Sequence, residues 1–193
     1  VDTLKHVSPD VLLLQEVLFD KREVLVNALD AVGFSYKTFA ETPTRTRSGN
    51  AVFSKYPIIN QFEHSFAELD DPDAARSPLP ASIVEIVKGT SKVILISVHF
   101  SWGYQSEGLR LRQAESLSRF AETALTENPE RVIIMGGDFN ASEHSSTIQF
   151  LKGRGLAPDN SYSTFWVDAW EVHGNADTWP TTGPQLYWTK RAA

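Results

Sequence analysis

The chain has 193 residues, of which 41% are hydrophobic and 22% charged, a composition typical of one folded globular domain and not of a disordered or fibrous chain. Its 18 Lys and Arg against 24 Asp and Glu give a net charge of −6, which argues against an extended contact with a polyanion. The absence of cysteine excludes disulfides and thiolate chemistry, and no apolar run approaches the roughly 20 residues that cross a bilayer.

The first part of the sequence predicts a strand, a helix and two further strands. DVLLLQE at 10–16 is a continuous apolar run, as in a strand buried on both faces. The spacing then becomes helical, which predicts a helix over 20–33 with a capping-box-like start. Pro57 interrupts the next run of strand-forming residues, so we expect one strand at 49–58 and another at 58–66.

The second part alternates strands with helices. Runs at 81–87 and 92–100 flank KGTS and predict a hairpin. Apolar residues recur every three or four positions over 107–127, which indicates an amphipathic helix against the core. RVIIMGGDFN at 131–140 predicts another buried strand, and STIQFLKGRG at 146–155 a short helix. Hairpins mixed with helices favour an α+β fold of stacked sheets covered by helices.

Three of these apolar strands end in polar residues that are costly to bury. The residues are Glu16, His99 and the pair Asp138 and Asn140. Taken singly, each has an ordinary interpretation, such as a solvated turn residue or a histidine with a satisfied hydrogen bond. Together they predict a site, because a desolvated carboxylate needs a cation, hydrogen bonds or water. We expect the carboxylates of Glu16 and Asp138 to face one polar pocket that His99 also lines.

The glycines before Asp138 support the same interpretation. Gly136 and Gly137 remove side chains where a ligand or neighbouring backbone comes close, or allow a positive φ at the strand end. On an extended chain Asp138 and Asn140 point to the same side, and Phe139 faces the core.

Four segments in this order resemble the endonuclease/exonuclease/phosphatase superfamily, which has the deoxyribonuclease I fold. They are PDVLLLQEV, SGNAVFSKYPI, ISVHF and IIMGGDFNA. The resemblance implies a four-layer αββα sandwich over residues 1–193 as one domain. It also implies a metal-dependent phosphoesterase of the phosphodiesterase or nuclease type, acting on nucleic acid or another phosphate ester.

The resemblance also implies roles for the polar residues. Glu16 would bind Mg²⁺ or Mn²⁺, a role suited to a hard carboxylate oxygen. Asp138 would orient or deprotonate the attacking water, and Asn140 would hold phosphate or water. His99 would hydrogen-bond a phosphate oxygen and stabilise the transition state.

Two residues of the long helix match an Arg-x-x-Gln that the family often shows after its His strand. Arg110 and Gln113 share one helical face, so they are candidates for substrate binding. The alternative for this pair is solvated helix surface.

The chain also departs from the family pattern. It begins inside or near the first helix, Tyr187 stands where an Asp is expected, and the family's final Asp-His pair does not follow. We therefore expect a domain incomplete at both ends that lacks the first and last strands, and attenuated hydrolysis by the chain as written. The alternative function is a catalytically impaired phosphate-binding or interaction module with the same fold.

Several properties stay open at this point. DNA, RNA, a phospholipid, an inositol phosphate and a protein–DNA adduct all suit the motifs as substrates, and the oligomeric state is undetermined. The sequence printed carries neither a signal-peptide pattern nor a membrane span, so we expect a cytoplasmic location.

Overall fold

The computed structural model describes residues 2–40, 47–69, 79–157, 159 and 166–173. The strands in these residues are β1 (Val11–Leu18), β2 (Tyr36–Phe39), β3 (Ser48–Ser54), β4 (Ile58–His64), β5 (Ala81–Lys88), β6 (Ser91–His99) and β7 (Val132–Asp138). The helices are α1 (Asp2–Val7), α2 (Arg22–Asp30), α3 (Glu107–Glu127), α4 (Ser146–Leu151) and α5 (Ala169–His173), with a 3₁₀ turn at Phe19–Lys21.

The chain folds into two compact units that interleave in sequence. Unit 1 comprises Val1–His64, Pro80–Val98 and Val132–Gly137. Unit 2 comprises Ser65–Leu79, His99–Arg131 and Asp138–Ala193. Because β6 and β7 each end at a unit boundary, the residues at these strand ends belong to unit 2.

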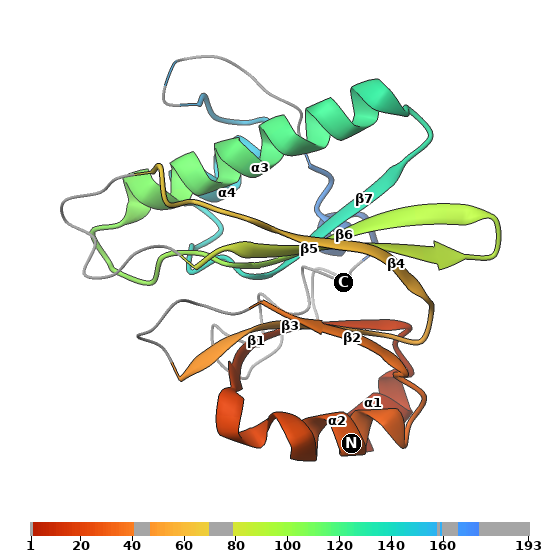
Figure 1. The fold of residues 1–193 in the computed structure, drawn as a ribbon. Helices are drawn as coiled ribbons and strands as arrows, with labels where there is room; N and C mark the ends of the chain where they lie inside the picture. The colour runs from red at the N-terminus through yellow and green to blue at the C-terminus, as the bar shows by residue number, and fades with distance from the viewer. Residues whose placement is uncertain (1, 41–46, 70–78, 158, 160–165, 174–193) are drawn as a thin grey trace. The chain divides into compact units, whose positions relative to one another are not determined.

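Unit 1 contains two sheets, with strand orders β1-β3-β2 and β4-β5-β6-β7 (Figure 1). Their shared core cluster consists of Val52, Val84, Ile86 and Leu95. The central strand β3 is buried along nearly its whole length, because alternate residues face the second sheet and the N-terminal helices. Apolar residues on both faces of β3 therefore hold three layers together.

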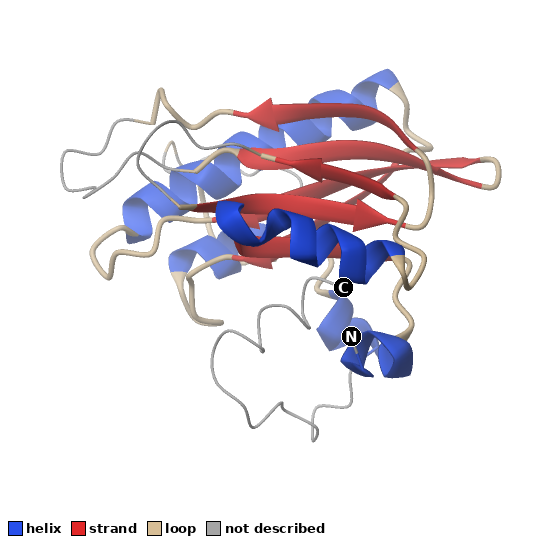
Figure 2. Ribbon diagram, turned by 60° about the horizontal axis from the view of Figure 1, so that its bottom comes forward, coloured by secondary structure: helices blue, strands red, loops and turns tan. Residues whose placement is uncertain are grey.

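Helices α1 and α2 cover the outer face of the β1-β3-β2 sheet, and Figure 2 brings this layer to the front. Its core cluster consists of Val17, Leu29, Phe34, Ala51 and Phe53. The helix expected over 20–33 starts later, because a 3₁₀ turn precedes α2. Lys21 stands at the N-cap of α2 without a side-chain cap, so the expected capping box is wrong.

The predicted hairpin is confirmed, because β5 and β6 pair antiparallel from Ser82 opposite Ser97 to Lys88 opposite Ser91. Gly89 has a φ of +63°, the left-handed conformation that such a tight turn requires. Strands β3, β4 and β7 also form within or close to their predicted ranges. Strand β2 was not predicted, since its four residues carry too short a pattern.

Unit 2 is built on α3, which spans the predicted range 107–127. Its buried face includes Leu109, Ala114, Leu117, Ala121 and Ala124, and α4 lies beside it (Figure 1). The indole N–H of Trp166 donates to Ser118 Oγ at 3.0 Å, which fastens the segment before α5 to α3. Phe100 and Phe139 pack edge to face with ring centroids 5.3 Å apart, so Phe139 faces the core as predicted.

The described elements form the predicted α+β fold. None of the helices among them is both long and apolar enough to span a bilayer. Tyr187 and the rest of 174–193 lie outside the described residues, so the expectation of missing outer strands stays a prediction.

Candidate functional site

The ends of β6 and β7 bring two of the predicted residues together. His99 Nε2 lies 3.9 Å from Asp138 Oδ2, and the two side chains are 11% and 22% exposed. The Phe100 backbone N–H donates to the Asp138 carbonyl at 2.8 Å, which holds the two strand ends side by side. An imidazole and a carboxylate thus meet where water still has access.

Asn140 joins the same cluster through a tight turn. Its backbone N–H donates to Asp138 Oδ1 at 2.9 Å, and its Nδ2 donates to the Phe100 carbonyl at 2.8 Å. Asn140 has a φ of +47°, and β7 ends at Asp138. The assumption of an extended chain through Asn140 is therefore wrong, because the Asp138 side chain bends the backbone there.

Gly137 explains why glycine precedes the carboxylate. Its φ is +140°, and a Cβ at this position would collide with the Val98 carbonyl oxygen and approach Gln15 Nε2. Gln15 Nε2 in turn donates to Ser97 Oγ at 3.0 Å, from β1 to β6. Strand β7 thus needs glycine for close backbone approach, as the sequence predicted.

Glu16 lies in unit 1, on a β-bulge of β1. Register shifts between Leu14 and Val17, so one extra residue stands opposite β3. Glu16 has a φ of +57° and an exposed side chain. A left-handed conformation at a residue other than glycine costs free energy, and such strain concentrates at functional sites. Because the Glu16 side chain is exposed to solvent, its carboxylate is accessible to an ion.

The two helix residues Arg110 and Gln113 are buried, with 5% and 0% exposure. The alternative of solvated helix surface is therefore wrong for both. Arg110 Nη1 donates to the Ser101 and Gly103 carbonyls at 2.8 and 2.7 Å, and Gln113 Oε1 accepts from the Ser101 N–H at 3.1 Å. Both side chains hold the segment that follows His99, and their predicted contact with substrate stays a prediction.

Sequence reasoning missed the residues that complete this arrangement. Glu107 Oε2 accepts from Arg110 Nε at 3.1 Å, and Glu107 Oε1 accepts from the N–H and Oγ1 of Thr147 at 2.8 and 3.0 Å. Glu107 therefore connects the loop after β6 to the start of α4, which follows Asp138 and Asn140. The spacing of Glu107 and Arg110 at i, i+3 was the available signal.

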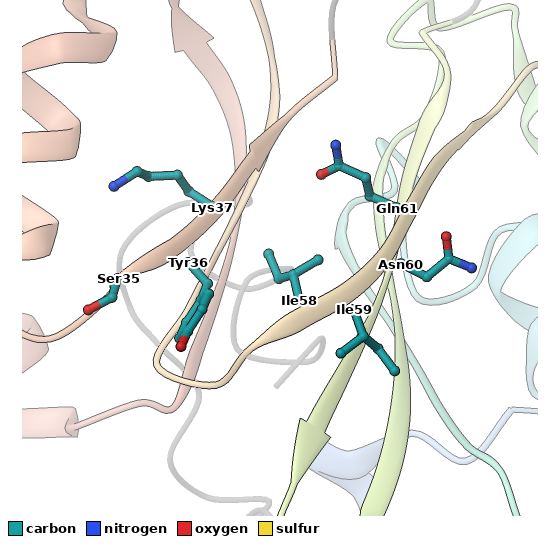
Figure 3. A pocket seen from close by; sticks show the side chains of 7 residues that line it. All are labelled: Ser35, Tyr36, Lys37, Ile58, Ile59, Asn60 and Gln61. Atoms are coloured by element: carbon teal, nitrogen blue, oxygen red, sulfur yellow. The ribbon is translucent and has the colours of Figure 1, made fainter.

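A pocket of about 550 Å³ lies elsewhere in unit 1, between the edge strands β2 and β4 (Figure 3). Its lining residues are Ser35, Tyr36, Lys37, Ile58, Ile59, Asn60 and Gln61. Lys37 Nζ is already paired with Asp30 at 2.7 Å. None of the predicted site residues lines this pocket, so we assign it no role in the chemistry.

A divalent cation at this chain would be held mainly by water and substrate, and not by a cage of protein ligands. No group of three or more His, Asp or Glu side chains gathers in the part of the chain that the structure describes. Mg²⁺ commonly keeps several waters and takes one or two carboxylates together with substrate phosphates. The exposed carboxylate of Glu16 has the chemistry of such a carboxylate ligand.

A stacked-sheet α+β fold with this polar cluster at its strand ends defines a protein of the deoxyribonuclease I-like class. A model described as the Endonuclease/Exonuclease/phosphatase family matches residues 1–192. The chain therefore belongs to this family of hydrolytic phosphoesterases.

Three known proteins are similar to the chain. Protein angel of Drosophila melanogaster is 27% identical over 165 residues, which are 78% of this chain and 44% of that protein. Truncated TDP2 of Caenorhabditis elegans has a TM-score of 0.65 at 20% identity and covers 89% of this chain and 60% of that one. ANGEL2, a 2′,3′-cyclic phosphatase solved with adenosine-2′,3′-vanadate, has a TM-score of 0.64 at 20% identity. The match covers 78% of this chain and 45% of the ANGEL2 chain. These two structures show the shared fold, and the chain spans less than half the length of protein angel.

Proposed function

We propose that the chain is a metal-dependent phosphoesterase that hydrolyses phosphodiesters, of the nuclease or phosphodiesterase type. The observation that carries the proposal is the approach of His99 Nε2 to within 3.9 Å of Asp138 Oδ2 at the ends of two adjacent strands. Two further findings support the proposal. The chain belongs to the family, and ANGEL2, a 2′,3′-cyclic phosphatase, has a similar fold.

Asp138 is the proposed base. Its Oδ1 is occupied by the Asn140 N–H at 2.9 Å, which fixes the plane of the carboxylate. Oδ2 faces His99 and remains able to accept a proton from water. A carboxylate with one oxygen anchored and the other available can orient a nucleophilic water and remove its proton.

His99 is the proposed donor to a phosphate oxygen. Its Nδ1 is buried and has no hydrogen-bond partner among the described residues. Burial of an N–H without a partner costs more free energy than burial of a lone pair, so Nδ1 carries no proton in our assignment. The proton is on Nε2, which faces Asp138. The imidazole then offers an N–H where negative charge develops on the phosphate.

Asn140 has a positioning part in this scheme. Its Nδ2 is held by the Phe100 carbonyl, and its backbone N–H is held by Asp138. The remaining amide oxygen can accept a hydrogen bond from the water beside Asp138.

Glu16 is the proposed ligand of Mg²⁺ or Mn²⁺, which when bound would neutralise phosphate charge in the transition state. Titration calorimetry of Mg²⁺ and Mn²⁺ into the wild type and Glu16→Ala tests this role. Equal heats for both proteins would remove Glu16 from the metal site. Glu127→Ala, on an exposed helix surface, is the matched control.

Hydrolysis of bis(4-nitrophenyl) phosphate with Mg²⁺ or Mn²⁺ tests the function itself. We expect turnover that falls roughly 10²- to 10⁴-fold in Asp138→Asn, the usual range for loss of a positioned base. Asp159→Asn, which changes an exposed carboxylate paired with Arg119, should leave the rate unchanged. Binding of phosphate esters without any turnover would favour the alternative, a phosphate-binding or interaction module.

A further inference from the structure

The β-bulge of β1 decides which residue follows Leu14 into the layer under the helices. Leu12 and Leu14 pack against the core cluster of that layer, and Val17 is a buried member of it. Side chains of a regular strand alternate between the two faces of a sheet, so the layer would receive Glu16 after Leu14. The extra residue of the bulge gives this place to Val17, and the Glu16 side chain is exposed.

Loss of the bulge would exchange the environments of these two residues. Without the extra residue, the Glu16 carboxylate would enter an apolar layer and Val17 would leave it. Burial of a carboxylate among apolar side chains is costly. In the observed form Glu16 has a φ of +57°, which costs free energy as well. The residues beside Glu16 therefore have to hold the bulge in its place.

Gln15 holds the chain on the other face of the sheet. Its Nε2 crosses between the two sheets of unit 1 and donates to Ser97 Oγ at 3.0 Å. Ser97 is fully buried on β6. The Gln15 side chain thus faces the second sheet, whereas Val17 packs in the layer under the helices. Contacts on opposite faces of the sheet fix the residues on both sides of Glu16.

Gly137 leaves the room that the Gln15 amide occupies. A Cβ on Gly137 would lie 2.9 Å from Gln15 Nε2. Gly137 is the residue before Asp138, the last residue of β7, and Ser97 stands two residues before His99, the last residue of β6. The amide of Gln15 therefore lies against two strands close to their ends.

The buried layer around the Gln15 amide is polar, unlike the core between the two sheets. Each of its members lies two residues along a strand from a residue of that core, and therefore on the same face of its strand. The members are Asn50, Ser82 and Ser97, each no more than 3% exposed. Asn50 Oδ1 is buried without a hydrogen-bond partner among the described residues. Apolar packing here would avoid this cost, which indicates that the polar contacts serve to fix the positions of the strands.

We propose that Gln15 is a positioning residue for Glu16. Its hydrogen bond to Ser97 keeps the bulge in its place, so that the exposed carboxylate stays available to a divalent cation. The inference rests on the proposed function in one respect, the role of Glu16 as a ligand of Mg²⁺ or Mn²⁺. The position of the bulge is a property of the chain without any metal.

Amide hydrogen exchange measures how firmly the bulge is held. Gln15→Met keeps the length of the side chain and removes the donor, and Ser97→Ala removes the acceptor. We expect each change to accelerate exchange at residues 15–17 about 5- to 150-fold, the range for a buried polar group that loses its partner. Exchange in the double variant should be about as fast as in the faster single variant, because the same hydrogen bond is lost in all three proteins.

Ser54→Ala is the matched control. Ser54 is also fully buried, and its Oγ accepts from the Tyr56 N–H at 2.9 Å at the other end of β3. This change should leave exchange at residues 15–17 as it is in the wild type. Unchanged exchange there in Gln15→Met and Ser97→Ala, equal acceleration at every amide of unit 1, or effects that multiply in the double variant would overturn the inference.

Titration calorimetry of Mn²⁺ into the same variants separates the inference from the proposed function. We expect Gln15→Met and Ser97→Ala to weaken Mn²⁺ binding about 10- to 100-fold, the range for loss of a residue that supports a metal ligand. Wild-type affinity in both variants, with binding lost in Glu16→Ala, keeps Glu16 as the ligand and overturns its positioning by Gln15. Equal heats for Glu16→Ala and the wild type, with exchange at residues 15–17 accelerated as expected, remove Glu16 from the metal site and keep Gln15 as the residue that holds the bulge.

Discussion

Glu107 accepts hydrogen bonds from both the backbone N–H and the hydroxyl of Thr147, at 2.8 and 3.0 Å. Its second oxygen holds the buried guanidinium of Arg110. One carboxylate at the start of α3 thus ties the segment after β6 to the segment after β7. The positions of His99 and Asp138 depend on this connection, because those two segments begin with them.

Glu107→Ala should destabilise the fold by about 1–3 kcal/mol, because it leaves donors of Arg110 and Thr147 without a partner. Urea unfolding gives the free energy. The control is Glu127→Ala, which breaks an i, i+4 pair between Glu127, 64% exposed, and Arg131, and should cost less than about 0.5 kcal/mol. Equal effects of the two substitutions would show that Glu107 is no more than a surface residue.

Gly137→Ala should cost about 2–4 kcal/mol, because it adds backbone strain and a collision with the Val98 carbonyl. Gly89→Ala isolates the strain, since Gly89 has a φ of +63° and nothing within 4 Å of an added Cβ. We expect that control to cost about 1–2 kcal/mol. If thermal unfolding ranks Gly89→Ala as the more damaging change, the close approach of β7 to β6 is not as described.

Burial lowers the pKa of His64 below its ordinary value of 6.5. The unfolded chain therefore takes up a proton at His64 more readily than the folded chain does. The free energy of unfolding therefore carries no penalty from His64 above about pH 6.5, and it decreases as the pH falls below that value. His64→Gln should reduce the loss of melting temperature between about pH 7.5 and 5. An imidazole pKa of 6.5 or higher, measured by NMR, would contradict this.

The sequence was sufficient for elements whose patterns are local. The helix at 107–127 has the predicted bounds because its apolar spacing persists for many turns. The hairpin at Lys88–Ser91 followed from its glycine turn. The need for glycine before Asp138 was also predictable, since few other reasons place glycine at the end of an apolar strand. The prediction that this strand is buried was wrong in its first half, where Val132 and Ile134 are 49% and 40% exposed.

Features that depend on a distant partner were not predictable. The bulge at Gln15 and Glu16 exists only in the register of β1 against β3. The Glu107–Thr147 contact joins residues that are 40 positions apart. Burial of Arg110 was missed because a charged residue on a helix is ordinarily solvated. Here the Glu107 carboxylate and the carbonyls of Ser101 and Gly103 compensate the buried charge.

The central claim is that His99 and Asp138 act together on a phosphodiester. A double-mutant cycle on kcat/KM for a single-stranded oligonucleotide, with His99→Gln, Asp138→Asn and the double variant, tests it most directly. We predict that each single change lowers kcat/KM about 10²- to 10⁴-fold. The kcat/KM of the double variant should be only slightly lower than that of the less active single variant, because residues acting as a unit share their effects. Losses that multiply in the double variant, or wild-type turnover in Asp138→Asn, would contradict the account.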